Sequence, residues 1–334
     1  MSKTVEEIAI ETGFSVTTVR FVINGQAKKY RISAKTQEKI EKFIALHGYS
    51  LNHAARSLKL NRSDTIGLVV PDLANAFFSR FMAALEILCR KRNLLLLTVS
   101  SHEDTELEDR AVANLLARGV DGLVIAPCQA ATVPPLLKNK ARNPVVMFDR
   151  DYRPAYFPTV ASDNFQGGLD MTRKMLNESM DSCYFLCGHV DLPSIQDRIR
   201  GFRVACEEKG IRDSGNLILK EAENSTAAGW QLMQGLIDSL QRPPRAFMCS
   251  SLLVLEGALQ QINSRIGHID KEILIGTFDD HTMLDLLPNR VLSIKQDEAA
   301  LAERVFERLI EPVIERKGSR PSDIVPCRLI CRNL

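Results

Sequence analysis

The feature that most restricts the fold of this chain is a regular alternation of short, mostly apolar runs with longer helical patterns between residues 64 and 334. The runs predict strands over 65–70, 94–99, 122–126, 145–148, 182–187, 216–219, 246–249, 273–277 and 291–294. Strands that are apolar along their whole length and alternate with helices indicate parallel sheets covered on both faces. So many units predict an α/β body with two doubly wound lobes rather than a single sheet.

Polar and aromatic side chains follow these predicted strands, at the ends where doubly wound sheets bind ligands. They are Asp72, Phe77, Phe78, Asp149, Arg150, Arg198, Ser251, Asp279 and Gln296. Carboxylates accept hydrogen bonds from sugar hydroxyls, an aromatic ring can stack on a sugar face, and arginine binds hydroxyl, carboxylate or phosphate groups. Taken singly, each residue fits a strand-end turn or a helix cap equally well. Together, polar strand ends in both lobes predict a cleft for a sugar or sugar-phosphate effector.

The sequence contains no recognisable catalytic signature, since it lacks the GxSxG, Walker A, HExxH and dinucleotide GxGxxG motifs. Residues 279–281 read Asp-Asp-His and resemble part of an acid–base set, but no nucleophile accompanies them. The scattered histidines and cysteines, with no CxxC pair, predict neither a metal site nor a cofactor. We therefore expect a binding cleft rather than an active site.

Compartment signals favour a cytoplasmic protein. The eight cysteines are spread along the chain and fit reduced, buried, apolar residues. No apolar run approaches the roughly 20 residues of a membrane span. The N-terminus lacks the apolar core of a signal peptide.

Charge separates the first residues from the rest. Residues 1–63 contain eleven Lys and Arg against five Glu and no Asp, a net charge of +6, while the whole chain carries +2. The remaining residues therefore carry −4. A small basic head on a mildly acidic body suggests that the head meets a polyanion, although lysine-rich helix faces are often only solvated.

The basic head also has the pattern of a helix-turn-helix. Thr4 followed by Glu7 is a capping box, and Gly13 ends the first short helix. Ser15 can cap a second helix over 16–23, and Ser33 can cap a third through residue 46. Two short helices joined by a tight turn and braced by a third form the helix-turn-helix unit.

The outer face of the second helix predicts contacts with DNA. Val16, Thr17, Arg20 and Phe21 are left off the expected apolar face, and the loop 26–31 adds cations beside a tyrosine. Threonine, valine and arginine can read base edges or grip phosphates. The predicted DNA-binding residues are Ser15, Val16, Thr17, Thr18, Arg20, Phe21, Asn24, Lys28, Lys29, Tyr30 and Arg31. A three-helix interaction module without nucleic acid remains the alternative.

Residues 50–62 predict a hinge. Asn52 can cap a helix that is too short to be stable alone, so it would order only against a partner. Leu58 stands among basic and polar neighbours and could act as an apolar wedge in a minor groove, with Ala55 and Arg56 beside it. The alternative is that Leu58 packs on the body as a linker anchor.

The chain resembles the LacI/GalR repressors over essentially its full length. The resemblance rests on Ile8-Ala9, Gly13-Phe14-Ser15, Thr18-Val19, Val22-Ile23-Asn24, Gly48-Tyr49, Asn52, Ala55-Arg56-Ser57-Leu58, residues 65–71, Arg198-x-x-Gly201-Phe202 and Phe278-Asp279-Asp280. The segments 22–33, 148–150 and 277–281 are similar to the branch of that family that holds fructose and sucrose repressors.

The resemblance implies a dimeric, cytoplasmic transcription regulator that binds a pseudo-palindromic operator through residues 1–49. It implies a hinge over 50–63 and a two-lobed effector domain, like periplasmic sugar-binding proteins, over 64–334. It places Arg198 and Asp279 at the effector, Asn52 at the start of the hinge helix and Leu58 in the minor groove. The last long helix, from about residue 299, is expected to return to the first lobe.

Departures from the family pattern also carry information. Phe21 stands at a recognition-helix position that is often arginine, and Ser251 replaces a usual asparagine. No apolar heptad tail is present, so nothing predicts a coiled-coil tetramer. Two competing hypotheses are a cytosolic sugar-binding enzyme with an appended nucleic-acid module and a periplasmic-type solute receptor. The missing catalytic set opposes the first, and the basic head opposes the second.

Overall fold

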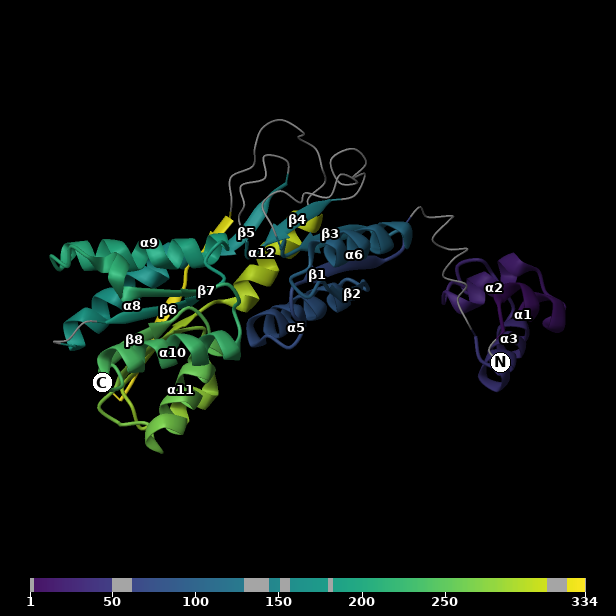
Figure 1. Cartoon of the computed structure of the whole chain (residues 1–334). Helices are drawn as coiled ribbons and strands as arrows, with labels where there is room; N and C mark the ends of the chain where they lie inside the picture. The colour runs from purple at the N-terminus through teal and green to yellow at the C-terminus, as the bar shows by residue number, and fades with distance from the viewer. Residues whose placement is uncertain are drawn as a thin grey trace. The chain divides into compact units, whose positions relative to one another are not determined.

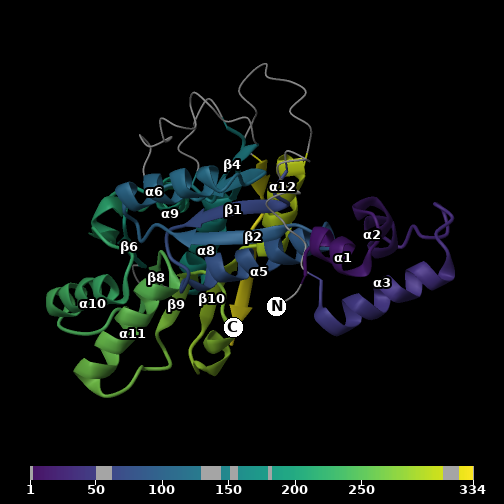
Figure 2. The ribbon, with the colours of Figure 1, turned by 90° about the vertical axis from the view of Figure 1, so that its right-hand side faces the viewer.

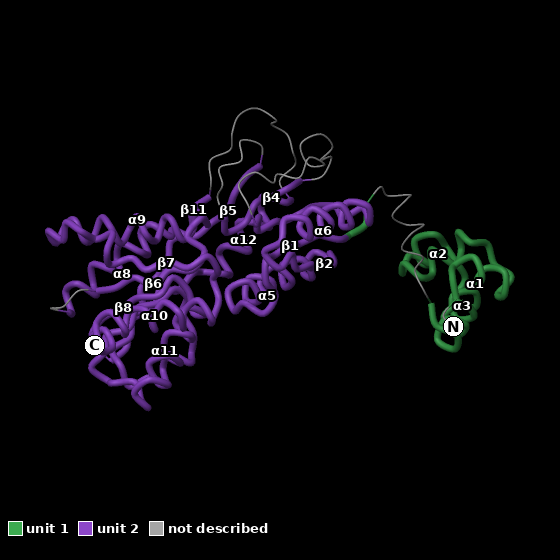
Figure 3. The backbone as a smooth tube through the Cα atoms, viewed as in Figure 1, with its two compact units in different colours: residues 1–64 green, residues 65–334 purple. Residues whose placement is uncertain are grey.

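The structure is a computed structural model that describes residues 3–49, 62–128, 144–150, 157–179, 183–310 and 323–333. The chain divides into two compact units, Met1–Asp64 and Thr65–Leu334, which we call the head and the body (Figure 3).

The described residues of the head contain three helices, whose starts lie where local capping residues predict them. Its helices are α1 (Val5–Thr12), α2 (Val16–Ile23) and α3 (Ala34–His47). The predicted caps Thr4, Ser15 and Ser33 each accept a hydrogen bond from a backbone N–H of the first helical turn, and Glu7 completes the capping box at Thr4. Gly13 has a φ of 76°, a left-handed conformation that glycine adopts without steric cost.

A small apolar cluster holds these helices together. Its buried members are Ile8, Ala9, Val19, Val22, Ala27 and Ile40. The prediction that Val16 lies off this core is wrong, since its half-buried side chain packs against the cluster. Val16 precedes Val19 by three residues, so both point to the same face of α2.

The first lobe of the body is a parallel sheet covered on both faces. Within the described residues its strand order is β11-β5-β4-β3-β1-β2. The strands are β1 (Thr65–Val70), β2 (Leu95–Ser100), β3 (Gly122–Ile125), β4 (Val145–Phe148), β5 (Thr159–Ser162) and β11 (Asp323–Val325). Helices α5 (Ala76–Lys91) and α12 (Glu298–Ile310) pack on one face and α6 (Thr105–Ala117) on the other.

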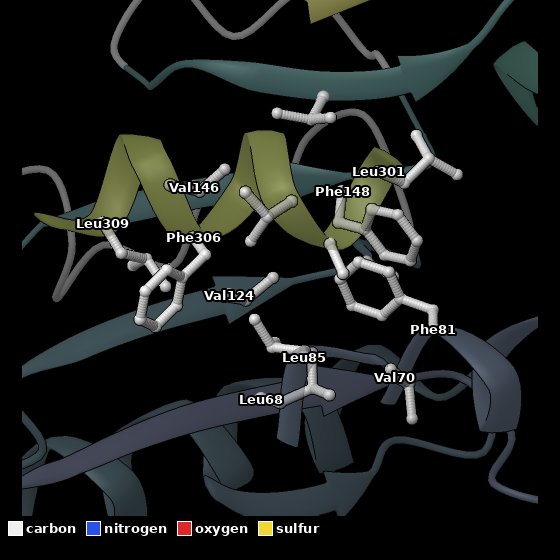
Figure 4. Close-up of a cluster of buried hydrophobic side chains, with 14 of the residues drawn as sticks. Leu68, Val70, Phe81, Leu85, Val124, Val146, Phe148, Leu301, Phe306 and Leu309 are labelled. Atoms are coloured by element: carbon white, nitrogen blue, oxygen red, sulfur yellow. The ribbon is translucent and has the colours of Figure 1, made fainter. Parts of the chain in front are cut away.

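The core under α5 and α12 is built around stacked phenylalanines. Phe81 of α5 stacks on Phe148 at the end of β4 with a ring-centroid distance of 3.6 Å, and Leu301 of α12 lies beside them (Figure 4). All three side chains are fully buried. This packing fixes the carboxyl end of β4, where Asp149 and Arg150 follow.

The second lobe repeats the arrangement. Its described strands lie in the order β12-β10-β9-β8-β6-β7, and only β12 runs antiparallel to its neighbour. The strands are β6 (Tyr184–Gly188), β7 (Ile218–Glu221), β8 (Ala246–Cys249), β9 (Leu274–Phe278), β10 (Val291–Lys295) and β12 (Arg328–Arg332). Helices α8 (Asn164–Glu178) and α9 (Pro193–Glu208) cover one face, and α10 (Thr226–Leu240) and α11 (Leu252–Ile266) cover the other (Figure 1).

The chain passes between the lobes after β5, after β10 and after β11. The prediction that the last long helix returns to the first lobe is confirmed, because α12 packs against α5 (Figures 1 and 2). Arg80 of α5 also donates a hydrogen bond to the Asp280 carbonyl oxygen of the second lobe at 3.0 Å. The two lobes therefore meet along the carboxyl ends of their strands.

The strand prediction holds for the continuous apolar runs and fails elsewhere. The predicted strand at 216–219 is displaced, because Ser214–Leu217 form a 3-10 helix (η1) and β7 begins at Ile218. Strands β5, β11 and β12 were not predicted, since β5 includes Thr and Ser, β11 has three residues, and β12 begins and ends with arginine.

Six of the cysteines are buried as expected, but Cys327 is half-buried and Cys331 is exposed. Cys327 directly precedes the edge strand β12, and Cys331 lies on it.

Candidate effector cavity and DNA-facing surface

A cavity lies where the strand ends of the two lobes meet. It contains about 660 Å³ of empty space, counting the part open to solvent. All nine predicted residues line it: Asp72, Phe77, Phe78, Asp149, Arg150, Arg198, Ser251, Asp279 and Gln296. Seven others also line it: Asn75, Glu103, Leu192, Ser194, Ile195, Asn224 and Leu253.

Arg198 is a buried and firmly held cation of the cavity. Its Nε donates to Asn164 Oδ1 at 2.8 Å, its Nη1 donates to the Ser250 carbonyl oxygen at 2.5 Å, and its guanidinium lies 4.0 Å from the centre of the Phe278 ring. The side chain is buried. A buried charge held by hydrogen bonds and an aromatic face is preorganised for an oxygen-rich ligand.

The expectation that Arg198 follows a strand end or opens its helix is wrong, because α9 begins at Pro193 and Arg198 lies in its second turn. Close contact between α8 and α9 sets its position. A Cβ on Gly168 would lie 2.6 Å from the Arg198 carbonyl oxygen, and one on Gly201 would meet the Phe165 carbonyl oxygen. Only glycine allows the two helices to approach this closely.

Asp279 and Gln296 form a polar pair on neighbouring strands. Asp279 follows β9 and Gln296 follows β10, and Gln296 Nε2 donates a hydrogen bond to Asp279 Oδ1. Both side chains are buried. Gln296 Oε1 has no hydrogen-bond partner among the described residues, so it can accept a hydrogen bond from a ligand hydroxyl.

The neighbouring residues of Asp279 face elsewhere. Asp280 accepts hydrogen bonds from Arg332 Nη2 and from the Ser293 hydroxyl, each at 2.7 Å. His281 Nδ1 accepts from the Met283 N–H and caps the 3-10 helix η2 (Thr282–Leu286). The three residues that resemble an acid–base set in the sequence thus point to three different surroundings.

Arg150 and Asp149 form the charged wall of the first lobe. Arg150 donates from Nη1 and Nη2 to the two carboxylate oxygens of Glu103, at 2.7 and 2.5 Å, and from Nη1 to the Pro127 carbonyl oxygen at 3.2 Å. Burial raises the pKa of Asp149, and the guanidinium groups of Arg150 and Arg198 lower it in part. Arg150 is thus already paired with an acid of the cavity wall.

Phe77, Phe78 and Ser251 contribute shape more than charge. Phe77 and Phe78 line the cavity, but both rings are largely buried and pack on Phe148. Ser251 donates its hydroxyl to Asn224 Oδ1 at 2.6 Å and caps α11 through the Val254 N–H. Ser251 therefore positions the Asn224 amide at the cavity.

The lining residues that were not predicted do not directly follow a predicted strand. Asn75 reads as a helix cap, and Leu192, Ser194 and Ile195 lie around the start of α9, in a segment with no apolar run. Asn224 follows β7, a strand whose predicted position was two residues too early, and Glu103 lies in an exposed turn after β2. A list of polar residues after every strand, β2 and β7 included, would have contained Glu103 and Asn224.

The predicted DNA-facing residues of the head are exposed or half-buried. Thr17, Asn24, Lys28, Lys29 and Arg31 are exposed. The Ser15 and Thr18 hydroxyls lie 2.8 Å apart within the cap of α2. The two residues therefore stabilise the N-terminal end of α2.

Two contacts hold the outer face of α2 in place. Arg20 Nη2 donates to Glu6 of α1 at 3.0 Å. Phe21 stacks on Tyr30 with centroids 3.6 Å apart and an interplanar angle of 8°. The stack ties the second helix to the basic loop 26–31, so the exposed cations and the helix face form one surface. The predicted hinge residues Asn52, Ala55, Arg56 and Leu58 lie outside the described residues.

The described ranges contain no cluster of three or more His, Cys, Asp or Glu side chains suited to a metal ion. None of the helices in the described part of the chain combines the length and apolar character that crossing a membrane requires.

Comparison with known proteins agrees with both units. Residues 4–52 match the family model of bacterial regulatory proteins of the lacI family, and residues 66–309 match the periplasmic binding protein domain. The sucrose operon repressor of Klebsiella pneumoniae is 31% identical, over 95% of this chain and 94% of its own length.

Solved structures show the same architecture. The Cra transcriptional dual regulator of Pseudomonas putida, in complex with fructose 1-phosphate, matches with a TM-score of 0.72 and 25% identity, covering 80% of this chain and 98% of that one. The lac repressor dimer bound to operator and the anti-inducer ONPF matches with a TM-score of 0.82 and 21% identity, covering 99% of this chain and 98% of that one. At that identity the lac repressor supports the fold alone.

A helix-turn-helix head joined to a two-lobed, ligand-binding type of body defines a DNA-binding transcription regulator. The chain belongs to the LacI family of bacterial regulatory proteins.

Proposed function

We propose that this protein is a homodimeric, cytoplasmic repressor of sugar-utilisation genes that leaves its pseudo-palindromic operator when a sugar or sugar phosphate binds in the cavity of the body. The observation that carries the proposal is the cavity itself. Side chains from both lobes line it, and its two cations, Arg150 and Arg198, are buried and held by hydrogen bonds. A ligand that contacts both lobes favours one relative orientation of the lobes, so it can shift an equilibrium between two states.

The chemistry of the lining favours a polyhydroxylated ligand. Asp279, Gln296 and Asn224 offer acceptors and donors for hydroxyl groups, and Arg198 offers a planar cation. The named relatives regulate a sucrose operon or bind fructose 1-phosphate. Fructose, sucrose and their phosphates are therefore the candidates.

Thermal denaturation of the full-length protein with each candidate tests the ligand part of the proposal. A ligand that binds only the folded state raises Tm, by an amount that grows with its concentration above Kd. We expect one of these sugars to raise Tm and to release an operator fragment at the same concentrations. A Tm that none of them changes would overturn the proposed effector class.

On the DNA side, we propose that Thr17 and Phe21 read bases. Both lie on the outer face of α2, and the Phe21–Tyr30 stack holds the ring beside the exposed cations. Selection of binding sites from random DNA should give different preferred sequences for Thr17→Ala, Phe21→Ala and the wild type. Identical preferences in all three would remove these residues from base reading.

We also propose that the protein is not an enzyme and needs neither metal nor cofactor. Asp279 faces the cavity while Asp280 and His281 are bound elsewhere, so these three residues do not form an acid–base set there. A turnover assay on the sugar that raises Tm separates this proposal from the alternative of a sugar-binding enzyme with an appended nucleic-acid module.

A further inference from the structure

We propose that Glu103 makes the cavity select an unphosphorylated sugar, because its carboxylate occupies the position on Arg150 that the phosphate of a sugar phosphate would take. This inference rests on the proposed sugar-binding function and names the class of sugar. It turns on a contact between two loops of the first lobe, the turn after β2 and the residues after β4.

The contact has the geometry of anion recognition. The two carboxylate oxygens of Glu103 accept from Nη1 and Nη2 of Arg150 at 2.7 and 2.5 Å. The guanidinium group is planar and donates two parallel hydrogen bonds to carboxylate or phosphate alike. The Arg150 side chain is 4% exposed and that of Glu103 is 38% exposed, so the cation is fixed in the wall while the acid lies at the surface of the cavity. An incoming phosphate would have to displace Glu103 to reach Arg150.

The charge of the whole cavity opposes an anion in the same way. Four carboxylic acids line it, Asp72, Glu103, Asp149 and Asp279, against the two arginines Arg150 and Arg198. The second arginine is also engaged, with Asn164, the Ser250 carbonyl and the Phe278 ring. Burial raises the pKa of Asp149, but even with Asp149 protonated the three other acids outnumber the two arginines. A phosphate with a charge near −2 would add to this excess of negative charge, whereas an uncharged sugar would not.

The backbone around Glu103 presents the carboxylate toward Arg150. His102 and Glu103 have φ values of 51° and 57°, in the left-handed region that non-glycine residues rarely adopt. Asp104, the next residue, caps α6 by accepting from the Glu106 and Leu107 N–H groups. The turn is therefore anchored at the start of α6. Its left-handed backbone conformation occurs at the same residue whose carboxylate pairs with Arg150.

The test compares wild type, Glu103→Gln and the control Glu106→Gln by calorimetry of the full-length protein with fructose, fructose 1-phosphate and inorganic phosphate. Glu106 lies in the first turn of α6, is exposed, pairs with Arg110 and does not line the cavity, so its variant removes the same charge elsewhere. We expect Glu103→Gln to increase the affinity for phosphate and for fructose 1-phosphate about tenfold. This change corresponds to about 1.4 kcal/mol of electrostatic repulsion removed with the carboxylate charge. Glu106→Gln should leave all three affinities unchanged, whereas in Glu103→Gln the affinity for fructose 1-phosphate should rise relative to that for fructose.

The outcomes separate this inference from the proposed function. If a sugar binds but the ratio of fructose to fructose 1-phosphate affinity is the same in wild type and Glu103→Gln, the role of Glu103 is wrong and the sugar site stands. If no sugar binds but Glu103→Gln alone gains affinity for inorganic phosphate, the occupied position on Arg150 is supported and the sugar proposal fails. Wild type that binds fructose 1-phosphate more tightly than fructose would also overturn the inference.

Discussion

The head and the body present their predicted binding residues in opposite ways. In the head these residues lie between positions 15 and 31, most of them are exposed, and one helix and one loop carry them. In the body, Arg198 and Asp279 are only 5% and 8% exposed and come from different elements that the sheet topology brings together. A surface of exposed cations suits a long polyanion, whereas a closed set of buried, hydrogen-bonded groups suits one small molecule. The comparison predicts that substitutions in the head alter DNA binding itself. Substitutions in the cavity should instead alter how the ligand controls DNA binding.

The largest effect is expected from removing the head. Deletion of residues 1–60 should abolish operator binding, because the exposed cations and the α2 surface are lost together. The body is a compact unit with its own apolar clusters, so it should still fold and bind the sugar with wild-type affinity. Gel-shift and calorimetric titrations measure the two properties. Operator binding by the truncated chain would break the assignment of DNA recognition to the head.

Loss of the Arg198 side chain should remove the effect of sugar on operator binding, while operator binding itself stays unchanged. Truncating a buried, hydrogen-bonded charge typically costs several kcal/mol, so Arg198→Ala should lower sugar affinity about 100-fold. The variant should bind operator normally and remain repressed in the presence of sugar. Arg200→Ala is the matched control, since Arg200 lies on the same helix, pairs with Asp197 and faces the Phe165 ring. Wild-type sugar affinity in Arg198→Ala would place the effector site elsewhere.

The basic loop of the head should act through charge alone. Replacing Lys28 and Lys29 with alanine removes two exposed cations. If each contacts a phosphate, the slope of log K against log salt should fall by about 1.8, and binding to all DNA sequences should weaken. Lys42→Ala provides the comparison, because Lys42 pairs with Glu38 on α3. A salt slope equal to that of the wild type would show that the loop does not contact the DNA backbone.

A smaller effect concerns a buried acid of the body near Arg150. Glu108 is fully buried, accepts the Cys128 N–H at 2.7 Å, and has its pKa raised mainly by burial. A folded-state pKa above the unfolded value means that the stability contributed by the protonated acid is present at low pH and is lost as pH rises through the folded pKa.

Glu108→Gln should therefore gain free energy of unfolding relative to wild type as pH rises from about 4.5 to 8, by about 1.4 kcal/mol for each unit by which the pKa is raised. Urea titrations at several pH values measure the difference. Glu106→Gln, on the exposed face of the same helix, should show no such trend. A pH-independent difference for Glu108→Gln would mean that the acid stays ionised in the folded body.

What the sequence could predict follows the same division between local and distant information. The caps at Thr4, Ser15 and Ser33 depend on residues three positions away, so the helix starts of the head were predicted correctly. The continuous apolar runs predicted most strands of both sheets for the same reason. Because parallel strands place their carboxyl ends along one edge, the polar residues that follow them could be grouped before their positions were known.

The rest depended on contacts that no local pattern encodes. The pairing of Glu103 with Arg150 joins two loops through the order of β2, β1, β3 and β4 in the sheet. Arg198 reaches the cavity from inside a helix because glycines let α8 and α9 approach closely. Val16 was misassigned because helix α2 is short, so its apolar face is defined by few residues. These errors arise where packing, rather than periodicity, decides where a side chain lies.

The central claim is that the sugar in the body controls DNA binding by the head, and reciprocal titration tests it most directly. Operator affinity is measured at zero and saturating sugar, and sugar affinity is measured with and without saturating operator. If the two sites are coupled, sugar weakens operator binding and operator weakens sugar binding by the same factor, about 5- to 150-fold for typical allosteric proteins. A sugar that binds tightly while both affinities stay unchanged would contradict the claim, because the cavity would then have no influence on the head.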